Sequence, residues 1–395
     1  PQDVLEIKEL ISNAGKQVPV IAKIEKHEAI EQMEAILPLC DGVMIARGDL
    51  GVELPAEDVP ILQKRLIALA NQLGIPIITA TQMLDSMAYN PRATRAEISD
   101  VANAILDGTD AVMLSNETAV GKYPIEAVAT MARIATRIEE DMLATRSDRT
   151  IQTSKRSIPN AISQAVGHIA EQLEAAAIMT LTKTGATARN VSKFRPKTPV
   201  LAITPHVDVA RQLQLVWGVK PLLVLNLPST SQTFQAAINV ALEKNLLAEG
   251  DLVVMSAGTL QGVPGSTDLI KVEVVTSVLG KGTGLGQGAV SGRARVAHSA
   301  MDVSNFNPGE ILVASRTSAE FVDAIRKAAG VITEDESLTS HAAVIAMRLG
   351  VPAIVGVKNA TQSIRDGAIL TLDTQRGLIY SGTVTSNYAD TAVTI

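Results

Sequence analysis

Two apolar stretches that each end in charge constrain the fold of this chain more than any other feature. Residues 20–25 read Val-Ile-Ala-Lys-Ile-Glu, and residues 41–51 run from an apolar stretch into Ala-Arg-Gly-Asp-Leu-Gly. Such runs predict buried strands, in which Lys23 and Glu25 point to one face because side chains alternate. In barrels of alternating strands and helices, the carboxyl ends of the strands carry the chemistry. The stretches therefore predict a site for a metal and a charged substrate.

Strands and helices alternate through the first 150 residues or so. Strands are predicted at 18–25, 41–46, 75–81 and 110–115. Helices are predicted at 4–11, 27–39, 58–73 and 124–140, with a further helix that begins at the capping box Thr94-Arg95-Ala96-Glu97 and turns Ile98, Val101 and Ile105 inward. Repeated strand–helix units predict an α/β fold, either a parallel sheet or part of a barrel.

Composition narrows the class of protein. The 395 residues predict two or three domains, and with 46% hydrophobic but only 2% aromatic residues, aliphatic side chains must fill the cores. The single cysteine, Cys40, excludes internal disulfides and suits a reducing cytoplasm. The net charge of −6, without a basic run, argues against nucleic acid as a partner. No apolar run is long enough to span a membrane, and we expect no signal peptide.

Polar groups close all four predicted strands, in the pairs Lys23/Glu25, Arg47/Asp49, Thr79/Thr81 and Ser115/Glu117. Glu25 and Asp49 offer hard oxygen ligands, which suit Mg²⁺ or Mn²⁺. Lys23 could neutralise charge on a transferred phosphoryl group or an enolate. The alternative is a set of structural ion pairs at a loop edge; the agreement of four strands favours a site.

The same stretches resemble pyruvate kinase, motif after motif and in order. The resemblance rests on residues 21–25, 44–53, 79–84 and 113–119 and continues through residue 280. It implies a (β/α)8 barrel, phosphoryl transfer from phosphoenolpyruvate to ADP that gives pyruvate and ATP, and a cytoplasmic homotetramer.

The resemblance also implies roles for single residues. Lys23 matches the catalytic lysine that stabilises the phosphoryl group and the enolate, and Thr81 matches a threonine near the proton delivered to the enolate. Glu25 and Asp49 match the Mg²⁺ ligands. Substrate binding is implied for Lys23, Ala46, Arg47, Gly48, Asp49 and Thr81. Arg92, Arg95 and Asp100 would lie toward subunit contacts.

The chain departs from the family pattern at its beginning. Only strands five to eight of the barrel are identified in residues 1–150, and the first half-barrel and the lid domain are not. The usual K⁺ site would lie in that part. A half-barrel exposes two sheet edges, so we expect a fragment of a longer chain with little or no activity alone.

Residues 151–280 are predicted to form an α/β domain, with a polar linker or a surface strand at 151–156. Its first strand runs into a turn of Thr182, Lys183, Thr184, Gly185, Ala186 and Thr187. From the residues alone an ordinary strand–helix turn is favoured. The resemblance instead implies the family's effector loop, with residues 256–267 as a second loop and a sugar phosphate or nucleotide monophosphate as ligand. Trp217 is expected to pack rather than to stack on a ligand.

Residues 285–395 are predicted to form a third domain, after a glycine-rich hinge or linker at 280–288. Residues 338–344 and 350–356 resemble the swivelling phosphohistidine domain of phosphoenolpyruvate-utilising enzymes. This makes His341, at a helix start, a candidate phosphohistidine. Asp335 and Glu336 add negative charge where a phosphate would approach, which favours an inactive domain instead.

Three functions therefore compete. The first is a pyruvate kinase with an extra domain, and the second is a phosphoenolpyruvate synthase or dikinase that uses His341. The third is a non-catalytic fragment that binds an effector at residues 182–187.

Overall fold

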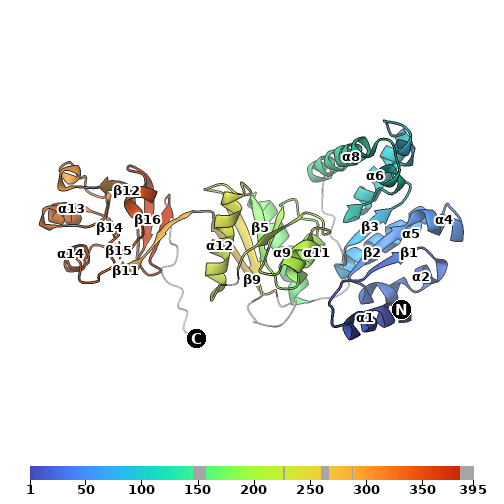
Figure 1. Cartoon of the computed structure of the whole chain (residues 1–395), viewed down its shortest axis with the longest axis horizontal. Helices are drawn as coiled ribbons and strands as arrows, with labels where there is room; N and C mark the ends of the chain where they lie inside the picture. The colour runs from blue at the N-terminus through green and yellow to red at the C-terminus, as the bar shows by residue number, and fades with distance from the viewer. Residues whose placement is uncertain (146–156, 226, 259–266, 287, 383–395) are drawn as a thin grey trace. The chain divides into compact units, whose positions relative to one another are not determined.

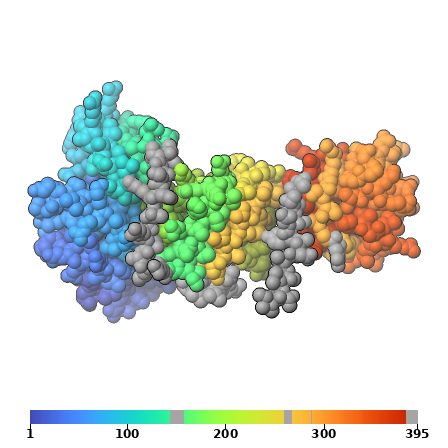
Figure 2. All heavy atoms as spheres, turned by 180° about the vertical axis from the view of Figure 1, so that it is seen from behind, coloured from blue at the N-terminus to red at the C-terminus, as the bar shows by residue number. Residues whose placement is uncertain are grey.

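The structure is a computed structural model that describes residues 1–145, 157–225, 227–258, 267–286 and 288–382. The chain divides into two compact units, one of residues 1–234 and 252–273 and the other of residues 235–251 and 274–395. Figure 1 labels the elements, and Figure 2 shows the heavy atoms with the remaining residues in grey. The predicted linker at 151–156 lies outside the described residues. The division into domains 1–150, 151–280 and 285–395 stays a prediction.

The first unit opens with a parallel sheet in the order β1-β2-β3-β4. Its strands are β1 (Ile21–Ile24), β2 (Gly42–Ala46), β3 (Ile77–Ala80) and β4 (Ala111–Val112). The larger helices are α1 (Gln2–Asn13), α4 (Arg47–Glu53), α5 (Val59–Leu73), α6 (Arg95–Asp107) and α8 (Pro124–Thr145). This confirms the predicted alternation of strands and helices (Figure 1).

Several predicted elements are shorter than expected or are interrupted. Only Ala111 and Val112 pair with β3, so the strand predicted at 110–115 ends early. The helix predicted at 27–39 breaks at Gln32, whose ψ of 16° is not helical, into α2 (His27–Glu31) and α3 (Met33–Ile36). A 3-10 turn with Pro38 follows α3, because proline is accepted in a first turn, where its missing N–H has no partner to lose.

The core of this sheet lies against α5. Ile45 of β2 and Ile77 of β3 are fully buried together with Leu66, Ile67 and Ala70 of the helix. Burial of such side chains stabilises a fold by about 1.5–3 kcal/mol each. The apolar packing holds the strands in the register that sets where their carboxyl ends lie.

The capping box at the start of α6 is confirmed. The Thr94 hydroxyl accepts from the Glu97 N–H, and the Glu97 carboxylate accepts from the Thr94 N–H at 2.7 Å. Val101 and Ile105 are buried as predicted, whereas Ile98 is 41% exposed. The inward prediction for Ile98 is wrong because this residue lies in the first turn, outside the cluster through which α6 packs on α8.

A second sheet in the first unit has the order β7-β6-β5-β8-β9. Its strands are β5 (Ala177–Leu181), β6 (Val200–Thr204), β7 (Val219–Leu223), β8 (Leu252–Ala257) and β9 (Leu269–Val274). The helices along this stretch are α9 (Ile158–Gln172), α10 (Ala186–Ser192), α11 (Val207–Leu213) and α12 (Thr230–Glu243). β5 lies between β6 and β8, so the strand order reverses at its carboxyl end. In open α/β sheets, ligands bind at such a switch point.

The second unit is built on an eight-stranded sheet in the order β10-β17-β16-β12-β13-β14-β15-β11. Its strands are β10 (Val278–Lys281), β11 (Thr283–Leu285), β12 (Ala289–Ala297), β13 (Ile311–Ala314), β14 (Gly330–Thr333), β15 (Ala353–Val355), β16 (Ile369–Asp373) and β17 (Leu378–Ser381). The larger helices are α13 (Val322–Lys327) and α14 (His341–Leu349). β12 to β15 are parallel, and the other pairings are antiparallel.

The glycine-rich stretch at 280–288 is not a hinge or linker over its described residues, so that prediction is wrong. β10 pairs with β17, and β11 pairs with β15. A Cβ on Gly282 would lie 2.3 Å from the Val355 carbonyl oxygen, and one on Gly284 would lie 1.8 Å from that of Thr374. The glycines are therefore required by close approach of backbone to backbone, and not by flexibility.

In the part of the chain that the structure describes, no helix combines the length and the apolar character needed to cross a membrane.

Glu97→Gln is expected to destabilise the first unit by about 1 kcal/mol, because the carboxylate caps α6 and also binds the N–H and hydroxyl of Ser86. Burial alone would raise the pKa of Glu97, but the hydrogen bonds from Ser86 and Thr94 outweigh it and lower that pKa. A carboxylate whose pKa is lowered on folding stabilises the fold above its unfolded pKa of about 4.3. This stabilisation is lost as the pH falls through the folded pKa.

Urea unfolding checks this at about pH 7 and about pH 3, where the gap between wild type and Glu97→Gln should shrink. Thr94→Ser, which keeps the capping hydroxyl, is the control and should change the midpoint little. A gap that stays constant or widens in acid would contradict the role given to the Glu97 carboxylate.

Candidate active site

Lys23 on β1 holds its ammonium group between two carboxylates. Its Nζ forms ion pairs with the carboxylate of Glu25 and with Oδ2 of Asp49, the latter at 2.9 Å. Glu25 follows β1, and Asp49 lies in the first turn of α4, directly after β2. The structure thus brings together three of the residues that the sequence places at the ends of neighbouring strands.

The charges in this cluster reinforce one another. The hydrogen bond to Glu25, followed by that to Asp49, raises the pKa of the Lys23 ammonium. The hydrogen bond from Lys23 in turn lowers the pKa of the Asp49 carboxyl. The side chains of Lys23, Glu25 and Asp49 are 51%, 36% and 55% exposed. At neutral pH the cluster therefore presents one cation and two anions to any molecule that reaches it.

The two carboxylates fit a hard divalent cation. Glu25 and Asp49 both pair with the Lys23 ammonium group, so their carboxylate oxygens lie close together. Among the described residues there is no group of three or more His, Cys, Asp and Glu side chains that could enclose a metal. Mg²⁺ commonly binds through one or two carboxylates and takes its remaining ligands from water and substrate phosphates. The donor set therefore suits Mg²⁺ or Mn²⁺ better than a metal that needs an all-protein cage.

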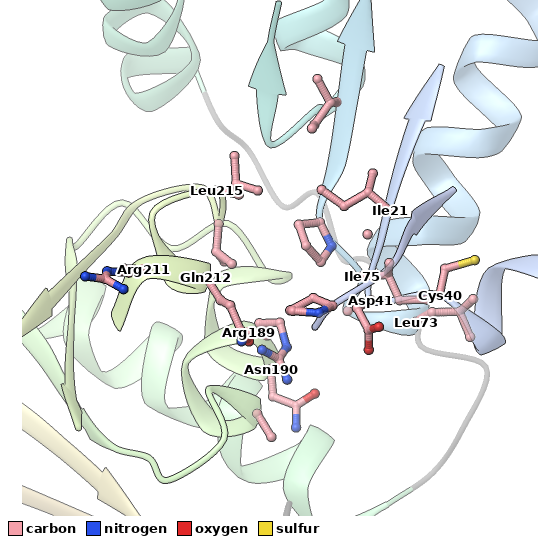
Figure 3. Close-up of a pocket in the computed structure, with 17 residues that line it drawn as sticks. Ile21, Cys40, Asp41, Leu73, Ile75, Arg189, Asn190, Arg211, Gln212 and Leu215 are labelled. Atoms are coloured by element: carbon pink, nitrogen blue, oxygen red, sulfur yellow. The ribbon is translucent and has the colours of Figure 1, made fainter. Parts of the chain in front are cut away.

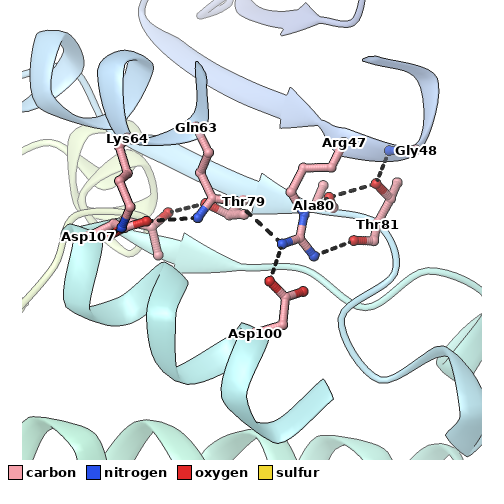
Figure 4. A network of polar contacts seen from close by, with 10 residues as sticks. Arg47, Gly48, Gln63, Lys64, Thr79, Ala80, Thr81, Asp100 and Asp107 are labelled. Atoms are coloured by element: carbon pink, nitrogen blue, oxygen red, sulfur yellow. Dashed lines mark hydrogen bonds and ion pairs between the residues drawn. The ribbon is translucent and has the colours of Figure 1, made fainter. Parts of the chain in front are cut away.

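Arg47 is the buried cation of the site, with a side chain only 9% exposed (Figure 4). Its guanidinium donates to the Asp100 carboxylate at 2.7 Å and to the Gln63 amide oxygen at 3.4 Å. It also donates to the backbone carbonyls of Ala80 at 3.3 Å and Thr81 at 2.7 Å. Arg47 therefore ties the start of α4 to α5, to α6 and to the end of β3.

Thr81 turns the chain at the end of β3 in a conformation that threonine rarely adopts. Its φ is +68°, and that of Gln82 is +55°, both in the left-handed region. The Thr81 hydroxyl accepts from the Gly48 N–H and donates to the Ala80 carbonyl, both at 2.7 Å. Left-handed backbone costs an L-residue roughly 1–2 kcal/mol, so these bonds and those of Arg47 must hold the turn.

The fourth strand end does not join the cluster, which corrects part of the prediction. Glu117 is 2% exposed, and its carboxylate accepts from the N–H groups of Leu84 and Ser115. Thr79 is fully buried and donates to the Thr109 hydroxyl. Both side chains therefore hydrogen-bond to partners inside the fold, and neither is a recorded partner of Lys23.

The roles of Asp100 and Gln63 in a polar network around Arg47 were not predicted from the sequence. Asp100 pairs with Arg47 at 2.7 Å, while the expectation that Arg92, Arg95 and Asp100 lie toward subunit contacts stays a prediction. Gln63 is 4% exposed and shares the buried face of α5 with Leu66. A polar residue in that apolar stripe was the available signal for a buried polar network.

The predicted effector loop lies at the switch point of the second sheet, between β5 and α10. Lys183 and Thr184 are exposed, while Thr182 and Thr187 are buried. Gly185 has a φ of +82°, and a Cβ there would lie 2.7 Å from a guanidinium nitrogen of Arg189. Ala186 begins α10. Thr267, at the end of the second predicted loop, donates to the Thr187 hydroxyl at 3.3 Å; residues 259–266 of that loop lie outside the described residues.

A cavity of about 570 Å³ lies at the other end of the first sheet (Figure 3). Ile21, Gly42 and Ile75, near the starts of β1, β2 and β3, line it together with Arg189 and Gln212. It does not include the Lys23 cluster.

The expected packing role of Trp217 agrees with its contacts, since its indole N–H donates to Glu139 and its ring lies 5.1 Å from the Arg195 guanidinium.

A parallel sheet of alternating strands and helices with charged groups at the carboxyl ends of its strands is the arrangement of the (β/α) barrel class. Comparison with known families agrees. The profile "Pyruvate kinase, barrel domain" matches residues 1–128, and "Pyruvate kinase, alpha/beta domain" matches residues 160–273. "PEP-utilising enzyme, mobile domain" matches residues 306–377.

Individual relatives cover nearly the whole chain. It is 73% identical to pyruvate kinase 2 of Synechocystis sp. over 382 residues, which are 97% of this chain and 64% of that protein. It is 49% identical to a pyruvate kinase of Geobacillus stearothermophilus, over 96% of this chain and 65% of that protein. A crystal structure of a pyruvate kinase from Cryptosporidium parvum matches with a TM-score of 0.62 at 35% identity, over 69% of this chain and 56% of that one.

The chain belongs to the pyruvate kinase family, as the resemblance of its motifs implied. It spans just under two thirds of the length of the Synechocystis and Geobacillus relatives.

Gln82→Gly is expected to stabilise the first unit by about 0.5–1 kcal/mol, because glycine relieves the left-handed conformation at an exposed side chain. Gln82→Val should destabilise it by at least about 1 kcal/mol, since a β-branched residue fits this conformation poorly. Urea denaturation measures both changes.

Gln72→Gly, in the right-handed helix α5, is the matched control and should cost about 1 kcal/mol. If glycine at residue 82 destabilised as much as glycine at residue 72, the strain assigned to this turn would be absent.

Proposed function

We propose that the protein transfers the phosphoryl group of phosphoenolpyruvate to ADP, giving pyruvate and ATP, as in the last step of glycolysis in the cytoplasm. The observation that carries this proposal is the Lys23 ammonium group held between the carboxylates of Glu25 and Asp49 at adjoining strand ends. Membership of the pyruvate kinase family supports it. The activity is proposed for the complete protein, since this chain spans less than two thirds of its relatives.

Lys23 is the proposed catalytic cation. The phosphoryl group leaves the enol oxygen of phosphoenolpyruvate for a β-phosphate oxygen of ADP, and negative charge grows on the enolate. An ammonium group beside the reacting oxygens favours that charge in the transition state. Glu25 and Asp49 would hold Mg²⁺ or Mn²⁺, which neutralises phosphate charge when bound. K⁺ is proposed as a second ion, without a site assigned to these residues.

The substrate carboxylate is proposed to bind the backbone at Ala46, Arg47 and Gly48. The Gly48 N–H is already donated to the Thr81 hydroxyl. A carboxylate that took this N–H would release the Thr81 hydroxyl, which is proposed to act near the proton delivered to the enolate. Pyruvate is completed by that proton, so binding and protonation would be linked through one hydrogen bond.

An effector with a phosphate group, either a sugar phosphate or a nucleotide monophosphate, is proposed to bind the loop from Thr182 to Thr187. The support is the position of the loop at a sheet switch point and the exposure of Lys183 and Thr184. A homotetramer is proposed from the family resemblance.

Lys23→Met in the complete protein is expected to lower turnover by at least about 10²–10³-fold, because it removes the cation that favours the transition-state charge. Pyruvate release with phosphoenolpyruvate, ADP and Mg²⁺ measures this. Lys26→Met, at a nearby exposed lysine, is the matched control and should keep its turnover. Near-normal turnover of Lys23→Met would refute the catalytic role. A complete wild-type protein that binds a sugar phosphate but releases no pyruvate would instead favour an effector-binding function.

His341 is proposed to remain unphosphorylated, which separates this function from that of a dikinase. It begins α14, where the Ser340 hydroxyl accepts from the Ala343 N–H, and its Nδ1 lies 2.9 Å from the Thr317 hydroxyl. Asp335 and Glu336 precede it with negative charge. Incubation with phosphoenolpyruvate labelled in its phosphate should leave no acid-labile label on either wild type or His341→Ala. Label on wild type that is lost in His341→Ala would support the dikinase function.

A further inference from the structure

We propose that Asp100 is a positioning residue of the candidate active site, which acts through Arg47 with the help of Gln63. The proposal rests on the proposed phosphoryl transfer and adds to it residues that never touch the substrate. Asp100 lies on α6, and Thr81 directly follows β3. Its carboxylate is 2.7 Å from the Arg47 guanidinium.

Burial makes the charge of Asp100 necessary. The Arg47 side chain is 9% exposed, and three of its four recorded acceptors are neutral oxygens. Within the described residues, Asp100 is the only carboxylate recorded as an ion-pair partner of Arg47. Removing one partner of a buried ion pair leaves an uncompensated charge, which is strongly unfavourable. Asp100 therefore keeps the guanidinium in place.

The guanidinium in turn fixes the turn at Thr81. It donates to the carbonyls of Ala80 and Thr81, and so it orients the peptide groups on both sides of a residue in left-handed backbone. With the Thr81 backbone held, its hydroxyl meets the Gly48 N–H at 2.7 Å. Gly48 directly precedes Asp49. A displacement of Arg47 would thus reach both the proposed carboxylate-binding backbone and a proposed metal ligand.

Gln63 sets the direction from which Arg47 is held. Its amide oxygen accepts from the guanidinium at 3.4 Å, and its amide nitrogen donates to Oδ2 of Asp107 at 2.9 Å (Figure 4). Because Asp107 can only accept, the amide oxygen must face Arg47. Asp107 also pairs with Lys64 on the outer side of α5. The network therefore continues from the site to the helix surface through fixed donors and acceptors.

The experiment compares Asp100→Asn with wild type in the complete protein. Asn keeps the shape and loses the charge. We expect kcat for pyruvate release to fall by about ten- to a hundredfold, as is typical when a group that orients a ligand is removed. Binding of Mn²⁺ alone, followed by electron paramagnetic resonance, should weaken at least severalfold because Asp49 is no longer held in place. Asp100→Glu, which keeps the charge, should recover part of both losses.

A double-mutant cycle with Arg47→Lys separates positioning from general stability. If Asp100 acts through Arg47, Asp100→Asn will add little to the kcat loss that Arg47→Lys already causes. Glu140→Gln, which removes the exposed carboxylate of the Arg137 ion pair, is the matched charge control and should leave kcat and Mn²⁺ binding unchanged. The thermal midpoint of each variant shows whether it is folded.

Two results would overturn the proposal. One is a lowered thermal midpoint in Asp100→Asn with kcat and Mn²⁺ affinity as in wild type, which is the behaviour of a structural ion pair. The other is additive loss in the cycle. A wild-type protein that releases no pyruvate would end the proposed function, while the Mn²⁺ comparison would still decide the role of Asp100.

Discussion

Parallel pairing of β1, β2 and β3 is the constraint on which the site depends. The register places Lys23 beside Met44 and Ile24 beside Ile45, and it places Ala46 beside Ala80. Because three strands run in the same direction in this register, the residues that follow them meet at one edge of the sheet. Glu25, Asp49 and Thr81 belong to different segments of the sequence, yet each is the first or third residue beyond a strand. Packing against α5 fixes the register and so fixes the site.

The two cations at this end of the sheet, Lys23 and Arg47, have different roles. Lys23 is half exposed, and exposed ion pairs contribute little to stability, so its two carboxylates matter chiefly for the electric field that they create. Arg47 is buried, and its bonds organise backbone instead. The sequence motif that holds Arg47 and Asp49 two residues apart therefore joins a buried structural anchor to an exposed carboxylate of the Lys23 cluster. The strained turn at Thr81 is held on one side by Arg47 and on the other by the Gly48 N–H, and these bonds keep its left-handed conformation in place.

Local chemistry made much of this fold predictable. The capping box at Thr94 was readable because both partners lie within four residues, and the alternation of strands and helices followed from apolar period and length. The proximity of Lys23, Glu25 and Asp49 was predictable because all three lie at or just beyond the ends of predicted neighbouring strands. The position of Glu117 could not be predicted in this way. Its carboxylate accepts from the N–H groups of Leu84 and Ser115, which come close to it only in the folded loop. The pair of Asp100 with Arg47 was not predicted because the two residues lie 53 positions apart in the chain.

The glycines between residues 280 and 286 carry a lesson for anyone who divides this protein into pieces. Composition there suggests a spacer, the usual place to cut a chain or to splice in a foreign sequence. Instead, the backbone at Gly282 lies close to the carbonyl group of Val355, and the backbone at Gly284 lies close to that of Thr374. Cutting the chain at these glycines would separate the edge strand β11 from β15. The fragment that follows would then expose the unpaired backbone of β15, which is open to pairing with other chains. A stretch with the composition of a spacer is here an integral part of the sheet.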